Sequence, residues 1–515
     1  MSELRVSTGS CIRETRMKKC ARALAALMLL GPTTWVCTRD GRALAVSAAS
    51  PFAQCDAPNY GCARTDTAAI PLATLPNWGG LKGAGTIFTD PSFSSSHPPK
   101  YVRVTDYNTG PNHWFSVGDG NGDDSHFNLD DTLLWITNDG NAIFVFGLVP
   151  ATMRLGLVSQ LTPERYCCNG QWSQINRNYF YTMTGDDKLW RLDFTGLSIA
   201  SPGRPTASLV YDFAANCGVG GVSVHNFGGI GGSDTIFTVT FGHQETGTKV
   251  AAYNSSSKKC YVYDTSAGVV TEYPSGSSLG SVTSKDRFTI HGAHGYGDGN
   301  WMLVTRGGTS CPTCAIYHAW RIGTTTVNNC ANWCSGHWTE TARGWFNDDR
   351  AGGAHGPSML FRTFADFSTS TIVQLNAGDA PIDELLESHP TTKNDPLGAQ
   401  NYPVFASTNA PSTSKAYSNE IVAWTQTPGN VLRFGHTFSS GQSTNFQAQI
   451  AVGAVSSTGQ FYAFTTDGEG TLGNTDGVQS TCTLSEGTCR SDVFILNLTG
   501  NSVAVTPSNS SPKAE

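Results

Sequence analysis

Histidines precede several strand-like stretches of this chain, and imidazole is a favoured ligand of transition metals. The sequence His291-Gly-Ala-His294 places two imidazoles on one glycine-containing loop. Loops that converge on a common axis would hold a metal in an open geometry suited to catalysis. We therefore expect a transition-metal site, for manganese or zinc, with four ligands: His225, His291, His294 and His355. The alternative is that these side chains, together with His126, form hydrogen bonds between neighbouring structural units.

Oxygen-bearing side chains alternate in the segment Asp119-Gly-Asn121-Gly-Asp123, and Asp130 follows shortly after it. A hard cation such as Ca²⁺ takes several oxygen ligands from one tight loop. The segment departs from the helix–loop–helix calcium pattern, because Asp124 stands where that pattern has glycine. We expect a calcium site formed by Asp119, Asn121, Asp123 and Asp130, with a polar β-turn as the alternative.

The chain contains 15 cysteines. Cys311-Pro-Thr-Cys314 and Cys330-Ala-Asn-Trp-Cys334 have spacings compatible with a zinc site of four thiolates. In an exported protein we expect disulfides instead. One disulfide would close a long loop between Cys217 and Cys260, and the others would be local bridges within Cys55/Cys62, Cys311/Cys314, Cys330/Cys334 and Cys482/Cys489.

The first residues have the pattern of a secretory signal peptide. Basic residues precede the apolar run 23–30, and Ala43-Leu44-Ala45 is a small-x-small cleavage site. The run is too short to span a bilayer. We expect residues 1–45 to be a signal region whose true start is Met17. The remaining chain would be secreted or periplasmic, with no stable membrane span.

The composition is typical of a β-rich globular protein with many turns. Charged residues make up 14% of the chain, hydrophobic residues 39%, and there are 56 glycines. The formal net charge of -7 argues against nucleic acid as a partner.

Strand-like segments separated by turn residues recur from Tyr101 onward, in about seven units whose starts lie roughly 40–65 residues apart. This spacing fits four-stranded blades with loops of variable length. The sequence therefore predicts an all-β, disulfide-containing β-propeller, with seven blades. The strand 101–105 would complete the last blade and close the ring. We expect an N-terminal arm over 46–100, the propeller over 101–500 and a flexible tail over 501–515.

Three stretches look like copies of one unit: 127–137, 175–183 and 455–464. Each has a polar turn followed by a hydrophobic strand. They resemble the "Ser-Pro-Asp-Gly" repeat of TolB-like and WD40-like β-propellers, although every copy replaces the Pro-Asp pair. The resemblance implies a propeller fold. It also implies one alternative function, that of an envelope scaffold protein.

A more distant resemblance is to propeller lyases that act on oligogalacturonides and hold a divalent metal with His and Gln. Arg433-Phe-Gly-His436 and Gln447-Ala-Gln449 look like the late metal-binding segment of that family. The resemblance implies roles for His436 and Gln447. It departs where the family has Gln-x-His-Pro, because this chain has Gln447-Ala-Gln449-Ile450-Ala451 there, with no histidine, so that one ligand of the family is missing.

Flat aromatic rings with polar rims suit stacking on sugars. Tryptophans near the expected loop face are Trp114, Trp172, Trp301, Trp320, Trp333, Trp338 and Trp345, and the alternative for them is core packing. Asp349 is a candidate acid or base. We expect the propeller to bind a glycan, peptide or protein partner at the loops around the channel mouth. The ligand-binding residues would be His126, Trp172, Asp349, His436 and Gln447. The alternative is a metal-dependent carbohydrate-active enzyme similar to the lyases, using manganese, zinc or calcium.

Overall fold

The computed structural model divides the chain into two compact units, 1–55 and 56–515. The residues that it describes are 34–37, 43–46, 55, 57, 60–71, 83–110, 114–117, 125–140, 142–162, 167–218, 224–242, 245–295, 297–307, 314–330, 338–349, 358–374, 391–394, 403–408, 417–425, 431–439, 451–472 and 490–499. In the first unit, β1 (Thr34–Cys37) pairs antiparallel with β2 (Ala43–Val46). No helix in the described ranges has both the length and the apolar character needed to cross a membrane.

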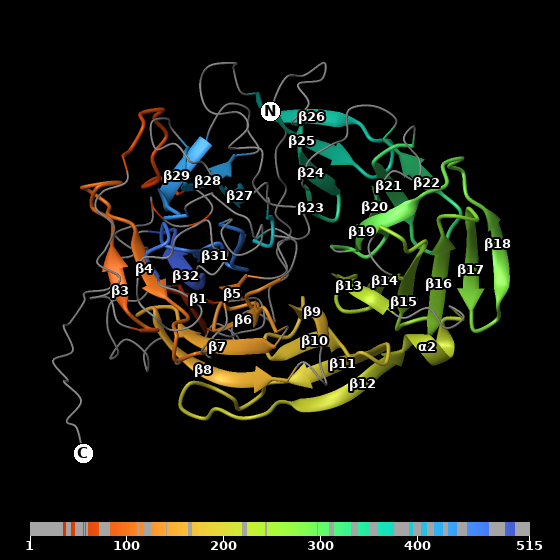
Figure 1. Ribbon diagram of the computed structural model, residues 1–515, viewed down its shortest axis with the longest axis horizontal. Coiled ribbons are helices and arrows are strands. Elements are labelled where there is room, and N and C mark those ends of the chain that lie inside the picture. Colours follow the sequence, from red (N-terminus) through yellow and green to blue (C-terminus); the bar gives the residue numbers. More distant parts are fainter. Residues whose placement is uncertain are drawn as a thin grey trace, which may run out of the picture. The chain divides into compact units, whose positions relative to one another are not determined.

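Within 56–515, seven antiparallel sheets are arranged around a common centre as the blades of a propeller (Figure 1). The predicted all-β, seven-bladed fold is therefore confirmed. Blade 1 consists of β5 (Phe115–Ser116), β6 (Leu133–Asn138), β7 (Ile143–Val149) and β8 (Arg154–Leu161). Blade 2 consists of β9 (Cys167–Trp172), β10 (Tyr179–Met183), β11 (Lys188–Asp193) and β12 (Thr206–Asp212).

Blade 3 is the widest sheet, with six strands. It consists of β13 (Val224–Gly231), β14 (Ile236–Phe241), β15 (Lys249–Asn254), β16 (Lys259–Asp264), β17 (Val269–Tyr273) and β18 (Ser277–Ser281). The short helix α2 (Phe213–Asn216) leads into it from blade 2. Blade 4 consists of β19 (Thr289–His294), β20 (Trp301–Gly307), β21 (Tyr317–Arg321) and β22 (Val327–Asn329).

Blade 5 consists of β23 (Trp338–Glu340), β24 (Gly344–Asp349), β25 (Ser358–Thr363) and β26 (Thr369–Gln374). Blade 6 consists of β27 (Val404–Ser407), β28 (Glu420–Trp424) and β29 (Val431–His436), and a bridge from Thr391 to Phe405 adds a segment on its inner side. Blade 7 consists of β3 (Ile87–Thr89), β4 (Lys100–Arg103), β30 (Gly453–Val455), β31 (Phe461–Thr466) and β32 (Asp492–Asn497).

Blade 7 closes the ring by combining strands from the beginning and the end of the propeller. β4 pairs antiparallel with β32, with Arg103 opposite Phe494. This pairing confirms the prediction that the strand beginning at Tyr101 completes the last blade. Buried charges reinforce the seam, since the Asp492 carboxylate accepts hydrogen bonds from Arg103 at 2.5 Å and from Thr105 at 2.8 Å.

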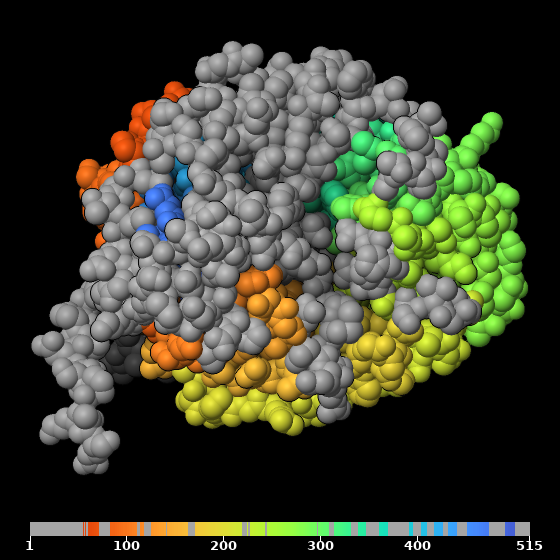
Figure 2. All heavy atoms as spheres, in the orientation of Figure 1, coloured from red at the N-terminus to blue at the C-terminus, as the bar shows by residue number. Residues whose placement is uncertain are grey.

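The hydrophobic core lies between neighbouring blades. Each blade packs on two others, so the second strand of a blade is buried on both faces, as in β14 and β31. Such strands are rich in apolar residues on both faces, although threonines occur in β14 and at the end of β31. The outer strands face solvent, and β18 is the clearest case, with exposed residues along most of its length. In Figure 2 the outer atoms of blades 2 and 3 are visible in yellow and green.

A recurring turn joins the first and second strands of several blades. Two residues before the second strand, the backbone is left-handed at Asp131, Asp234, Gly299 and Gly459, with φ between 59° and 73°. Glycine adopts this conformation without steric cost, and aspartate is among the residues that tolerate it. The aspartates also join adjacent blades, because Asp131 of blade 1 accepts a hydrogen bond from Ser456 of blade 7 at 2.7 Å.

The segment before β3 is attached to the outer strand of blade 6. Arg64 and Arg433 exchange backbone hydrogen bonds of 3.0 and 2.9 Å. The Arg433 guanidinium also donates to the Ala68 carbonyl at 2.9 Å, and it is fully buried with Glu420 in a bidentate ion pair of 2.5 and 2.7 Å. These contacts fix the segment to the sheet. The predicted boundary at residue 100 stays a prediction.

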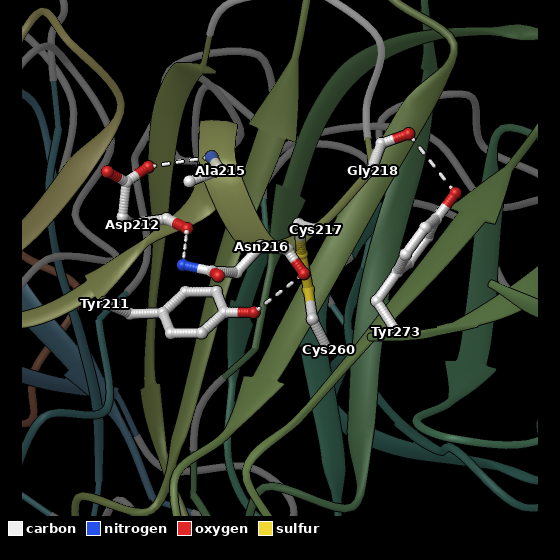
Figure 3. Close-up of a disulfide and its surroundings, with 8 residues drawn as sticks. All are labelled: Tyr211, Asp212, Ala215, Asn216, Cys217, Gly218, Cys260 and Tyr273. Carbon is white, nitrogen blue, oxygen red and sulfur yellow. Dashed lines mark hydrogen bonds between the residues drawn. A yellow bond between two sulfur atoms is a disulfide. The ribbon is translucent and has the colours of Figure 1, made fainter. Parts of the chain in front are cut away.

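A disulfide joins Cys217, directly after α2, to Cys260 in β16 (Figure 3). The pairing confirms the predicted long-loop bridge. The Asp212 carboxylate caps α2 by accepting from the Ala215 N–H, as expected for an N-cap aspartate. Further disulfide-bonded cysteines are Cys55, Cys62, Cys314 and Cys330. Oxidation of Cys314 and Cys330 removes the thiolates that a zinc site would need.

Candidate functional site between blades 4 and 5

The predicted histidine His126 lies on the inner side of blade 1, fully buried and stacked on Trp135. Its Nδ1 lies 3.0 Å from the Trp135 carbonyl oxygen, so Nδ1 carries the proton and Nε2 carries the lone pair. Burial, together with the positive charge of Lys393, lowers the pKa of His126 to about 4. His126 is therefore neutral near pH 7. Within the described ranges, no group forms a hydrogen bond with Nε2.

The two histidines of blade 4 have different surroundings although both lie on β19. The backbone bulges between Ile290 and Gly292, which alters the usual alternation of side chains. His291 is exposed, and its Nδ1 lies 2.6 Å from the Glu245 carboxylate. His294 is buried, with its ring centroid 5.7 Å from that of Trp338.

The other predicted metal ligands are only partly visible. His225 lies on β13 without a described side chain, and His355, Asp119, Asn121 and Asp123 lie outside the described residues. Asp130 is described, and it forms a 2.6 Å ion pair with Arg177 of the next blade. In the part of the chain that the structure describes, no predicted ligand belongs to a group of three His, Cys, Asp or Glu with ligand atoms within 4.8 Å of one another. Both metal sites stay predictions.

Among the predicted ligand-binding residues, Trp172 and His436 are buried in the fold. The Trp172 indole donates to the His126 carbonyl at 2.9 Å. His436 contacts Asp90 through Nδ1 at 2.7 Å and the Ile70 carbonyl through Nε2 at 3.4 Å. Both ring nitrogens of His436 are thus engaged inside the protein. Gln447 and the side chain of Asp349 are not described.

A group of buried polar atoms lies on one face of the inner strands of blade 5. Trp338 and Glu340 are two residues apart on β23, and Glu340 pairs directly with Trp345 on β24. Residues two apart on a strand, and residues directly opposite on paired strands, share a face of the sheet. This face packs on blade 4, since Trp338 contacts the rings of His294 and Tyr317.

None of these three side chains satisfies its polar atoms in the described part of the chain. Both carboxylate oxygens of Glu340 and the indole nitrogens of Trp338 and Trp345 are buried without a hydrogen-bond partner there. Other buried indoles are bonded, as Trp135 is to Ser125 at 2.9 Å. A buried carboxylate without a partner costs several kcal/mol, and buried indole N–H groups normally find an acceptor.

Glu340 also occupies a position that four other blades fill with apolar side chains, whereas blade 6 has the buried Ser407 there. It lies opposite the second residue of the following strand, as do Phe127, Trp172, Ile230 and Val455. Those four are at most 1% exposed and pack on the preceding blade. A carboxylate there weakens the packing and leaves a charge between two blades. We call Trp338, Glu340 and Trp345 the β23 cluster.

Sequence comparison identifies no relative, since no family model and no curated protein sequence matches. Solved structures with a similar fold include an oligogalacturonate lyase in complex with manganese, at 10% identity and a TM-score of 0.49, covering 84% of this chain and 98% of that one. An oligogalacturonate lyase from Vibrio parahaemolyticus gives the same values. The C-terminal WD40 domain of Sif2 covers 72% of this chain and 94% of its own, at 10% identity and a TM-score of 0.40. These likenesses concern the propeller fold alone.

Proposed function

We propose that this propeller is an exported binding protein that takes a neutral glycan at the β23 cluster. The observation that carries the proposal is the buried Glu340 carboxylate beside two buried indole N–H groups, all three without a hydrogen-bond partner among the described residues. A sugar hydroxyl both donates and accepts, so one hydroxyl can give its proton to the carboxylate while another accepts from an indole. The aromatic rings supply apolar surface for the C–H faces of the sugar.

The charge of the site favours a neutral ligand over a uronate. The described polar atoms of the β23 cluster comprise the two oxygens of one carboxyl group and two neutral donors. A second carboxylate placed beside Glu340 would meet like-charge repulsion in a medium of low polarity. The proposed ligand of the β23 cluster is therefore a neutral sugar and not an oligogalacturonide.

Burial also favours a small ligand unit over a protein surface. Glu340 is 2% exposed and Trp345 is fully buried. A protein partner would contact the rim of such a site but would not reach the carboxylate. Binding of a peptide or protein partner is therefore to be tested at the loops and not at the β23 cluster.

The test is a titration of the purified protein with neutral and acidic oligosaccharides, read by tryptophan fluorescence and calorimetry. We expect binding of neutral sugars, and a loss of at least about tenfold in affinity for E340Q. The same variant should unfold at an unchanged or higher temperature, because it removes a buried carboxyl group that has no hydrogen-bond partner among the described residues. The matched control is E272Q, which alters a partly exposed carboxylate paired with Lys259. Unchanged affinity in E340Q would contradict the proposal.

A metal-dependent enzyme is the second candidate, and His126 is the observation that favours it. Its Nδ1–H is held by a carbonyl and its neutral Nε2 is unpaired in the described structure, which is the arrangement of many metal-binding imidazoles. Elemental analysis after incubation with Mn²⁺, Zn²⁺ or Ca²⁺ distinguishes the two functions. Metal retention that H126A abolishes, together with formation of an unsaturated product, would favour the enzyme. Sugar binding without metal or turnover would favour the binding protein.

A further inference from the structure

Asparagine sequons suitable for N-linked glycosylation occur at Asn254 and Asn497 within the described residues. The first reads Asn254-Ser255-Ser256 and the second Asn497-Leu498-Thr499. A sequon alone has little meaning, because the transfer enzyme must reach both the amide nitrogen and the hydroxyl two residues later. The two sequons differ sharply in this respect.

Asn254 ends β15 at the turn that leads into β16 of blade 3. Its side-chain oxygen accepts hydrogen bonds from the N–H groups of Ser256 at 2.9 Å and Ser257 at 3.0 Å. No described group takes a hydrogen bond from its amide nitrogen, and Ser256, Ser257 and Lys258 are exposed. The turn thus fixes the oxygen end of the amide and leaves the nitrogen end unused by the fold.

Asn497 is held in the opposite way. It ends β32, which lies between β4 and β31 in blade 7, and it is 6% exposed. Its side-chain oxygen accepts from both the N–H and the hydroxyl of Thr499, each at 2.9 Å. The sequon hydroxyl is therefore engaged, and Leu498 beside it is buried. A glycan on Asn497 is incompatible with this blade.

We propose that Asn254 is a glycan attachment site of the exported protein, and that Asn497 stays unmodified. The donor is an oligosaccharide linked to a lipid pyrophosphate. The Asn254 amide nitrogen forms a bond to C1 of the first sugar as the C1–O bond to the pyrophosphate breaks. The lipid pyrophosphate leaves, and the amide nitrogen loses one proton. The proposal rests on the exported location included in the proposed function.

The site fits the hairpin because modification changes neither backbone pairing nor the turn. Asn254 pairs with Ile236 on one side and Lys259 on the other through backbone atoms. The two hydrogen bonds to its side-chain oxygen remain available when the nitrogen carries a sugar. The attached chain would project into solvent from the turn that joins β15 to β16.

The experiment expresses the full chain behind a eukaryotic host's own secretory leader and measures the mass of the secreted protein before and after removal of N-linked glycans. We expect one glycan on Asn254, located by peptide mapping. N254Q and S256A should each lose it, whereas S257A, which changes the neighbouring serine, and N497Q should keep it. Secreted wild-type protein without sugar on Asn254, or with sugar on Asn497, would overturn the proposal.

Failure of the exported location is distinguished by a separate arm. The same chain is expressed with only its own N-terminal residues. If it stays inside the cell while the host-leader form is glycosylated at Asn254, then the location is wrong and the attachment site stands. Sugar binding by the β23 cluster is measured independently with E340Q.

Discussion

Removal of the Cys217–Cys260 disulfide should lower the unfolding free energy of the propeller by about 4 kcal/mol. The bridge closes a loop with a sequence separation of 43 residues. The chain-entropy relation for a loop of this length gives about 4 kcal/mol at 25 °C, because the unfolded chain regains the freedom that the bridge removes. Both cysteines are fully buried, so replacement by alanine avoids burying a new hydroxyl.

The assay compares the wild type with the C217A/C260A double variant by urea unfolding followed by circular dichroism. For cooperative unfolding of a propeller of this size, the same change lowers Tm by about 4 °C. The local structure around α2 should persist, because Asp212 still caps Ala215 and Tyr211 still donates to the Asn216 carbonyl (Figure 3).

Two results would refute this reasoning. A free-energy difference below about 1 kcal/mol would show that the loop is not free in the unfolded chain. If the double variant only lost protection of the α2 amides from hydrogen exchange, and its urea midpoint did not change, the disulfide would stabilise only a local segment. Reduction of the wild type is not a substitute for the double variant, because Cys314 and Cys330 are also disulfide-bonded.

Two further predictions concern buried ionisable residues, Glu420 in blade 6 and Asp131 at the contact between blades 1 and 7. E420A should cost about 3–5 kcal/mol in urea unfolding, since it leaves Arg433 buried without its bidentate partner, whereas E272A, at the partly exposed pair with Lys259, should cost less than about 1 kcal/mol. Burial raises the pKa of Asp131 to about 6 from 3.8. The folded state therefore binds this proton more tightly, and the resulting stability, about 3 kcal/mol, is present below pH 3.8 and lost as pH rises through 6. D131N should remove that part of the pH dependence in urea titrations from pH 4 to 7. Parallel curves for D131N and the wild type would contradict it.

Most of the fold could be predicted because packing between blades determines which residue types occur in the inner strands. A second strand buried on both faces is mostly apolar, as in the first four residues of β6, and a turn follows the inner strand. The closing strand β4 was predictable because it is a short β-forming segment that lies ahead of the first four-stranded blade in the sequence. Strands with few buried residues could not be found in this way. The two outer strands of blade 3, β17 and β18, carry mostly exposed or half-buried side chains.

The site was less predictable because its chemistry arises from contacts between distant segments. The sequence drew attention to Trp338 and Trp345 as flat aromatic residues. It gave no reason to single out Glu340, whose neighbours in the chain form no motif. The engagement of His436 by Asp90 and Ile70 was likewise invisible, because those partners lie more than three hundred residues away in the chain.

The repeat does contain a sequence signal for Glu340. The signal is hard to see because the turn between the first and second strands of blade 5 differs in length from that of blade 1. In blade 1 the turn runs from Asn128 to Leu133, which are joined by backbone hydrogen bonding. In blade 5 the corresponding bond joins Thr341 to Gly344, so the turn is shorter by two residues and lacks the left-handed position. An alignment of the repeats by their turns therefore places blade 5 in the wrong register. In that alignment Glu340 is not matched with Phe127 and the equivalent residues of the other blades. Only the strand ladder restores the register, and it then shows a carboxyl side chain where four other blades have an apolar residue.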